Sequence, residues 1–114
     1  ESGCNGLTNN DYGMMTYPAR IITSNVTYTN NESCTWVISS SRPLQINFHR
    51  ISTEECCDFL FVRDGNTSKS DILAILRGNM SDTLVNTTSN SAHLQFTSDF
   101  SNVQRGFWMY WKVV

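Results

Sequence analysis

Residues 44–48 read Leu44-Gln45-Ile46-Asn47-Phe48, with apolar and polar side chains in strict alternation. Successive side chains of a β-strand point to opposite faces, so this pattern predicts a strand with one face turned toward a core. The same period of two recurs in residues 36–38, 94–96 and 107–113. In residues 59–62 both faces are apolar. These segments are all expected to be strands.

Turn-forming residues separate the predicted strands, as in the runs 30–31, 39–41, 64–66 and 89–91. Their spacing is typical of an all-β protein in which two antiparallel sheets form a sandwich. Residues 72–76 (ILAIL) fit either a buried strand or a short helical turn, and their length favours a strand. Because the chain carries no repeat or linker, residues 1–114 are expected to form a single domain.

The last predicted strand, residues 107–113, carries large side chains on both faces. We expect it to lie in the centre of a sheet, with one face in the core. On the other face, Trp108 and Tyr110 either pack under loops or form an aromatic platform for a ligand.

Composition excludes several classes of function. The chain has 8 basic and 10 acidic residues and a net charge of −2, so it lacks the positive charge that nucleic acids or anionic membranes attract. It also lacks an apolar run long enough to span a bilayer. No nucleic-acid partner and no membrane insertion are expected.

Four cysteines and several N-glycosylation sequons predict an extracellular location, as a secreted protein or an ectodomain. Zinc is disfavoured, because Cys56 and Cys57 are adjacent and neither His49 nor His93 has a ligand spacing. Since the chain begins with Glu1, we expect a mature or excised segment of a larger extracellular protein. The sequons are Asn25, Asn31, Asn66, Asn79 and Asn86.

The order of these features resembles the CUB family of extracellular β-sandwich modules. The resemblance is carried by a cysteine near the start, a Tyr-Pro turn, a Cys-x-Trp strand, an Asp-strand-Asp-Gly signature, and a Phe-x-Ser-Asp-x-Ser block before Gly-Phe. The corresponding residues are Cys4, 16–18, 34–38, 58–65, 94–101 and 106–107. The resemblance implies a jelly-roll-like sandwich.

The family resemblance also bears on the cysteines, of which four allow three pairings. It implies a Cys4–Cys34 disulfide. The position at which the family usually has its last cysteine reads Arg77-Gly78-Asn79, without a cysteine. We therefore expect Cys56 and Cys57 to bond each other, with free thiols or a bond to another chain as alternatives.

The calcium-binding branch of the family implies a metal site. Glu54, Glu55, Asp58 and Asp64 are close in sequence and are expected to gather at one end, where the CUB arrangement would add Asp99. Crowded carboxylates repel one another unless a cation intervenes, and Ca²⁺ prefers such oxygen ligands. The resemblance implies the following roles: Glu54, Asp58 and Asp99 bind calcium through side chains, Ser101 binds through its carbonyl, Asn102 binds through water or orients the loop, and Tyr17 positions the acids.

The function implied is a calcium-dependent module for protein–protein interaction, as in cell adhesion, whose acidic loops bind a lysine or arginine of a partner. One alternative is a glycan-binding module that uses Trp108, Tyr110 and Trp111. Another is a structural spacer without metal. A heparin-type polyanion is disfavoured because the arginines are scattered along the sequence, at positions 20, 42, 50, 63, 77 and 105.

Catalysis is not expected. His49 and His93 are predicted to be exposed residues of strands, and no serine lies in a Gly-x-Ser-x-Gly turn. The pattern therefore predicts no enzyme, and it does not specify an oligomeric state.

Overall fold

The computed structural model describes residues 5–18 and 27–114, and every regular element in these ranges is a β-strand. The strands are β1 (Gly6–Asn9), β2 (Tyr12–Tyr17), β3 (Ser33–Ser39), β4 (Leu44–Ser52), β5 (Phe59–Asp64), β6 (Asp71–Leu76), β7 (Asn79–Asn86), β8 (Ser91–Thr97) and β9 (Gly106–Val113). Within the described part of the chain, no helix could cross a lipid bilayer.

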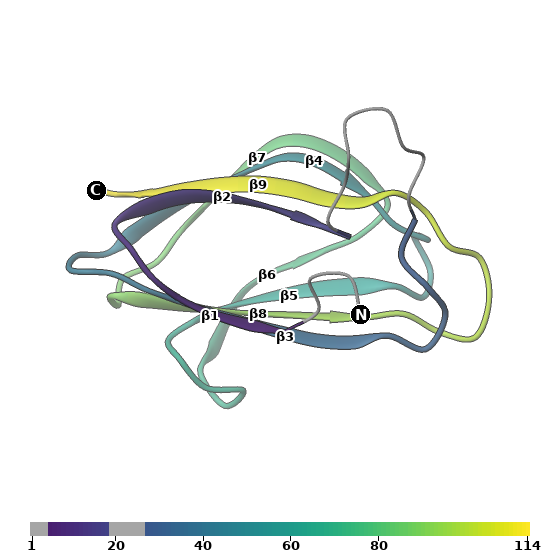
Figure 1. Ribbon diagram of the computed structural model, residues 1–114, viewed down its shortest axis with the longest axis horizontal. Helices are drawn as coiled ribbons and strands as arrows, with labels where there is room; N and C mark the ends of the chain where they lie inside the picture. The colour runs from purple at the N-terminus through teal and green to yellow at the C-terminus, as the bar shows by residue number, and fades with distance from the viewer. Residues whose placement is uncertain (1–4, 19–26) are drawn as a thin grey trace.

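The strands form two layers, which Figure 1 shows one above the other. One sheet has the order β1-β3-β8-β5-β6 and the other has the order β2-β9-β4-β7. All neighbours pair antiparallel except β1 and β3, which are parallel. The predicted two-sheet sandwich is confirmed, and β9 (yellow) lies between β2 and β4 as expected of a central strand.

The alternating residues meet between the two sheets. Leu44, Ile46 and Phe48 of β4 are fully buried, while Gln45 and Asn47 between them point the other way and are partly exposed. In β5 the buried face is the one with Leu60 and Val62. Aromatic rings from both sheets and from the segment before β3 pack against one another in the core: Tyr17, Tyr28, Trp36, Phe48, Phe96 and Phe107.

Two expectations about exposure were wrong. Residues 71–76 form a strand, but β6 is the edge of its sheet, so Ile72 and Ile75 are about half exposed instead of buried. His93 on β8 is only 5% exposed, because neighbouring strands pair with β8 on both sides. His49 is exposed as predicted.

The pairing of β5 with β8 brings distant loops together. Phe59, the first residue of β5, lies opposite Thr97, the last residue of β8. Asp58 immediately precedes β5 and Asp99 closely follows β8, so both lie at the same end of the sandwich. The segment before β3 joins them there, because the Asn31 amide donates to the Asp99 carbonyl at 2.7 Å.

Candidate metal centre

Three carboxylates come together at this end of the sandwich. One oxygen each from Glu54, Asp58 and Asp99 can be chosen so that all lie within 4.8 Å of one another. Glu54 and Asp58 belong to the loop between β4 and β5, and Asp99 belongs to the connection between β8 and β9. The structure thus brings together the three acids that were expected to bind calcium through their side chains, and their crowding creates the repulsion that a bound cation would offset.

Asp58 is the centre of the cluster and is fully buried. Its Oδ2 accepts a hydrogen bond from the Tyr28 hydroxyl at 2.5 Å, and its Oδ1 accepts one from the Asp99 amide at 3.0 Å. The Tyr28 oxygen in turn accepts from the Glu54 amide at 3.1 Å. Burial, together with the hydrogen bond to Asp58, raises the pKa of the Tyr28 phenol, so it remains a donor.

The tyrosine that hydrogen-bonds Asp58 is Tyr28, whereas the resemblance implied this supporting role for Tyr17, which stays a prediction. Tyr17 packs in the core against Trp36 and Phe96, and its hydroxyl oxygen lies 3.5 Å from Sγ of Cys34. Tyr28, which hydrogen-bonds Asp58, was missed because no strand period or motif marks it. Its role depends on how the segment before β3 packs against the β4–β5 loop.

Glu54 supplies the observation that favours a cation. Its Oε1 is buried and has no hydrogen-bond partner among the described residues, whereas its Oε2 accepts from the Asn102 side-chain amide at 2.9 Å. A buried acceptor without a donor is unfavourable, and a hard cation can satisfy it. The donor set, carboxylate oxygens from two loops, fits Ca²⁺ in particular.

Ser101 and Asn102 lie in the same connection. The Ser101 amide donates to Oδ1 of Asp99 at 3.2 Å, and Asn102 has a backbone φ of 65°. The side-chain amide of Asn102 contacts Glu54, while its implied roles, binding through water or orienting the loop, remain predictions. The expected carbonyl ligand of Ser101 remains a prediction.

Two other acids do not join the cluster. Asp64 lies at the far end of β5, where its carboxylate accepts hydrogen bonds from Thr88 and Ser89 in the β7–β8 loop. Burial alone would raise the pKa of Asp64, but these hydrogen bonds outweigh it and lower the pKa to about 2. Glu55 is exposed and its carboxyl group approaches Gly78 instead. The expected position of Asp64 at this end was therefore wrong, whereas Glu55 lies in the same loop as Glu54 but outside the group of three carboxylates.

The cysteines of the loop are bonded in the structure. Sγ of Cys56 and Sγ of Cys57 form a disulfide within the turn that separates Glu54 from Asp58. The amides of Cys57 and Asp58 both donate to the Glu54 carbonyl, at 3.3 and 3.1 Å. Cys34 is buried and disulfide-bonded. Cys4, its expected partner, lies outside the described residues.

The remaining candidate residues are distributed over the surface. Asn31, Asn66, Asn79 and Asn86 are exposed, as glycosylation requires, while Asn25 lies outside the described ranges. Of the three aromatic candidates for glycan contact, Trp108 and Tyr110 are 39% and 44% exposed. Trp111 is 5% exposed and belongs to the core, so its assignment to a binding surface was wrong.

Known proteins share this architecture. Rat neuropilin-2 is 29% identical over 112 residues, which are 91% of this chain and 12% of neuropilin-2. The full extracellular region of zebrafish Gpr126/Adgrg6 superimposes with a TM-score of 0.77 at 28% identity, covering 96% of this chain and 14% of that one. The MASP-1 CUB2 domain bound to Ca²⁺ has a TM-score of 0.77 at 21% identity, covering 97% of this chain and 98% of that one.

This chain thus spans only a small part of neuropilin-2 and of the Gpr126 region, and corresponds in extent to the single MASP-1 domain. The family model of the CUB domain matches residues 4–111, nearly the whole chain. Together with the two-sheet sandwich described above, this match establishes that the chain belongs to the CUB domain family.

Proposed function

We propose that this chain is an extracellular module that binds a protein partner with the help of a calcium ion held by Glu54, Asp58 and Asp99. The observation that carries the proposal is the buried, unpartnered Oε1 of Glu54 within a group of three carboxylates. Calcium would supply the positive charge that offsets their repulsion, with Ser101 and Asn102 completing the loop around it. Bound calcium in the MASP-1 CUB2 domain supports the proposal by analogy of fold.

The chain's own residues prepare this site for a partner. Tyr28 and the Asp99 amide hold Asp58 in one orientation, so no ordering of that carboxylate is needed when the partner binds. Glu54 and Asp99 are partly exposed and can accept hydrogen bonds from a lysine or arginine of the partner.

Phe100 adds an apolar contact beside the acids. It follows Asp99 directly and is 78% exposed, which is unusual for a large aromatic side chain. A phenyl ring next to a carboxylate can pack against the aliphatic stem of a lysine and attract its ammonium group through its face. Phe100 therefore favours a cationic side chain on a protein as the partner's contact.

Calorimetric and thermal titration with CaCl₂ test the metal. We expect a dissociation constant of about 10⁻⁴ to 10⁻³ M, as in other extracellular modules, and about 1.4 kcal/mol of stabilisation at a tenfold excess over that constant. Asp99→Asn should abolish both effects. Asp71→Asn, which removes an exposed acid of β6 at the other end of β5, should change neither.

The partner contact is tested separately with a lysine-containing peptide, compared with the same peptide carrying glutamine. We expect binding of the lysine peptide in calcium and its loss in EDTA. Absence of calcium binding would refute the metal site and leave a glycan-binding module and a structural spacer as the alternatives. Calcium binding without any effect on the lysine peptide would refute the recognition step alone.

A further inference from the structure

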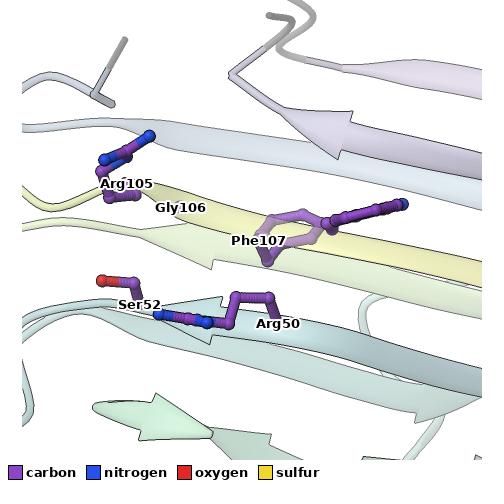
Figure 2. A pocket seen from close by; sticks show the side chains of 6 residues that line it. Arg50, Ser52, Arg105, Gly106 and Phe107 are labelled. Carbon is purple, nitrogen blue, oxygen red and sulfur yellow. The ribbon is translucent and has the colours of Figure 1, made fainter. Parts of the chain in front are cut away.

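The strongest feature outside the acidic cluster is a cavity of about 250 Å³ between the end of β4 and the start of β9. It is lined by Arg50, Ser52, Arg105, Gly106, Phe107 and Trp108. Figure 2 shows Arg50 extending along β4 toward Ser52, while Arg105 lies on the other side, next to Gly106. The two arginines are 55 positions apart in sequence, and strand pairing brings both to one cavity (105 − 50 = 55).

The local register explains this convergence. A β-bulge after Phe48 shifts the pairing of β4 with β9, so that Arg50 lies opposite Trp108 and Ser52 lies opposite Gly106. Gly106 has a φ of 91°, and a Cβ there would lie 1.9 Å from the Tyr17 carbonyl oxygen. The backbone at this position therefore lies too close to Tyr17 to accommodate a side chain.

Both guanidinium groups are available to a ligand. Within residues 5–18 and 27–114, no carboxylate lies within 4.0 Å of Arg50 or Arg105, and no hydrogen bond occupies either one. Both side chains are exposed. Two cations that have no partner in the described part of the chain border this cavity. They favour an anion that presents a pair of oxygens to each guanidinium group.

The shape of the surface favours a ligand longer than a single anion. Arg50 also borders a second cavity of about 170 Å³, which it shares with Asn79, Met80 and Ser81. Arg50 therefore borders both cavities, one lined from β4 and the start of β9 and the other lined from β4 and β7. Hydroxyl and amide groups line these two cavities, together called the groove, and the indole of Trp108, which lines the first, is 39% exposed.

We propose that this groove binds an acidic oligosaccharide, with Arg50 and Arg105 holding its sulfate or carboxylate groups and Trp108 packing against a sugar ring. Donors and acceptors from Ser52, Ser81 and Asn79 match the hydroxyl groups of such a ligand. From the sequence a polyanion site was disfavoured, because the arginines are scattered along the chain. The fold brings two of them, Arg50 and Arg105, to one cavity. The groove shares none of the proposed calcium ligands, but it lies next to the calcium loops, because Arg105 belongs to the same β8–β9 connection as Asp99 and Ser52 ends β4 just before the loop of Glu54.

The probes are heparin, hyaluronan and chitin tetrasaccharides, which carry sulfate with carboxylate, carboxylate alone, and no charge. Asn79 borders the second cavity and lies in a sequon. The protein used in the test therefore carries the substitution Asn79→Gln, so that no attached glycan competes with the probe. Binding is measured by titration calorimetry in EDTA at low salt. We expect an acidic probe to bind more weakly as NaCl rises, and the stronger of the two charged probes identifies the anion.

Arg50→Ala and Arg105→Ala should each weaken binding about tenfold, because each removes a charge-assisted pair of hydrogen bonds. Arg42→Ala, which removes an exposed arginine from the β3–β4 turn, should leave binding unchanged, and Arg50→Lys should restore part of it. Equal binding of the uncharged probe, or binding unaffected by both arginine variants, would overturn the proposal. A polyglutamate peptide is tested as well. If it binds and none of the saccharides does, the proposal is wrong and the groove is assigned to an acidic protein. The titration is repeated in CaCl₂, because Arg105 shares a connection with Asp99; a failure that is the same in EDTA and in calcium is independent of the calcium site.

Discussion

Replacing Tyr28 by phenylalanine isolates the hydrogen bond on which the acidic cluster depends. The change removes the donor 2.5 Å from Oδ2 of the fully buried Asp58 and the acceptor 3.1 Å from the Glu54 amide. A hydrogen bond to a charged group contributes about 1.5–3 kcal/mol, and an unsatisfied amide adds up to about 1 kcal/mol. We therefore expect Tyr28→Phe to lower the free energy of unfolding by about 2–4 kcal/mol without calcium.

Urea unfolding at pH 7 in EDTA measures this loss, and thermal unfolding should show a decrease of roughly 8 to 16 °C for a domain of this size. Tyr12→Phe is the matched control, because the Tyr12 side chain is 78% exposed. In a double-mutant cycle with Asp58→Asn, the two changes should be strongly non-additive. A loss below about 0.5 kcal/mol, or full additivity, would refute the argument that Tyr28 holds Asp58.

Three further changes test other parts of the structure. Asp64→Asn should destabilise the protein by about 1 kcal/mol at pH 7. Because the pKa of Asp64 is lowered to about 2 from an ordinary value of 3.8, this loss of stability should disappear in urea unfolding as the pH falls from about 4 to 2. A loss that stays constant over this pH range would contradict the prediction. Replacing Cys56 and Cys57 together by serine should weaken calcium binding about threefold to tenfold in calorimetry, because the loop between two proposed ligands loses a covalent constraint. Unchanged affinity would show that the hydrogen bonds of the turn are enough to hold the loop in place. Gly106→Ala should lower the free energy of unfolding by about 2 kcal/mol or more in the same assay, because the new Cβ would clash with backbone and φ is 91°. Gly6→Ala is the control, since a Cβ there would lie 3.4 Å from the nearest atom, in Trp36. Equal losses in the two variants would refute the steric explanation.

Alternation was sufficient to predict the sandwich, for a definite physical reason. A shift of one residue in a strand moves its whole apolar face into solvent, so the pattern of residues 44–48 specifies which side faces the core without any knowledge of its neighbours. The same holds for residues 107–113, where Phe107, Met109 and Trp111 are buried and Trp108 and Tyr110 are exposed. Residues 72–76 are apolar throughout, so their sequence could not reveal that β6 lies at an edge.

The acids of the proposed metal site could be named from motif resemblance, but their meeting depends on β5 pairing with β8. Asp58 and Asp99 are neighbours because Phe59 lies opposite Thr97. The same dependence explains why Tyr28 was missed and why Asp64, only six positions from Asp58, lies elsewhere (64 − 58 = 6). An extended strand places its two ends far apart, so Asp58 and Asp64, which flank β5, lie at opposite ends of the sandwich although they are close in sequence.

The sequence by itself thus predicted which segments form strands and which residues are candidates for binding. It did not predict which charged side chains lie together in space. The alternating strands, the exposed sequons and the acidic candidates follow from short-range pattern, because each depends on a residue and its immediate neighbours. The buried contact of Tyr28 with Asp58 and the joint cavity of Arg50 and Arg105 arose only when the sheets assembled. Strand register and one bulge decide which side chains from distant segments share a face, and no local rule of sequence contains that information.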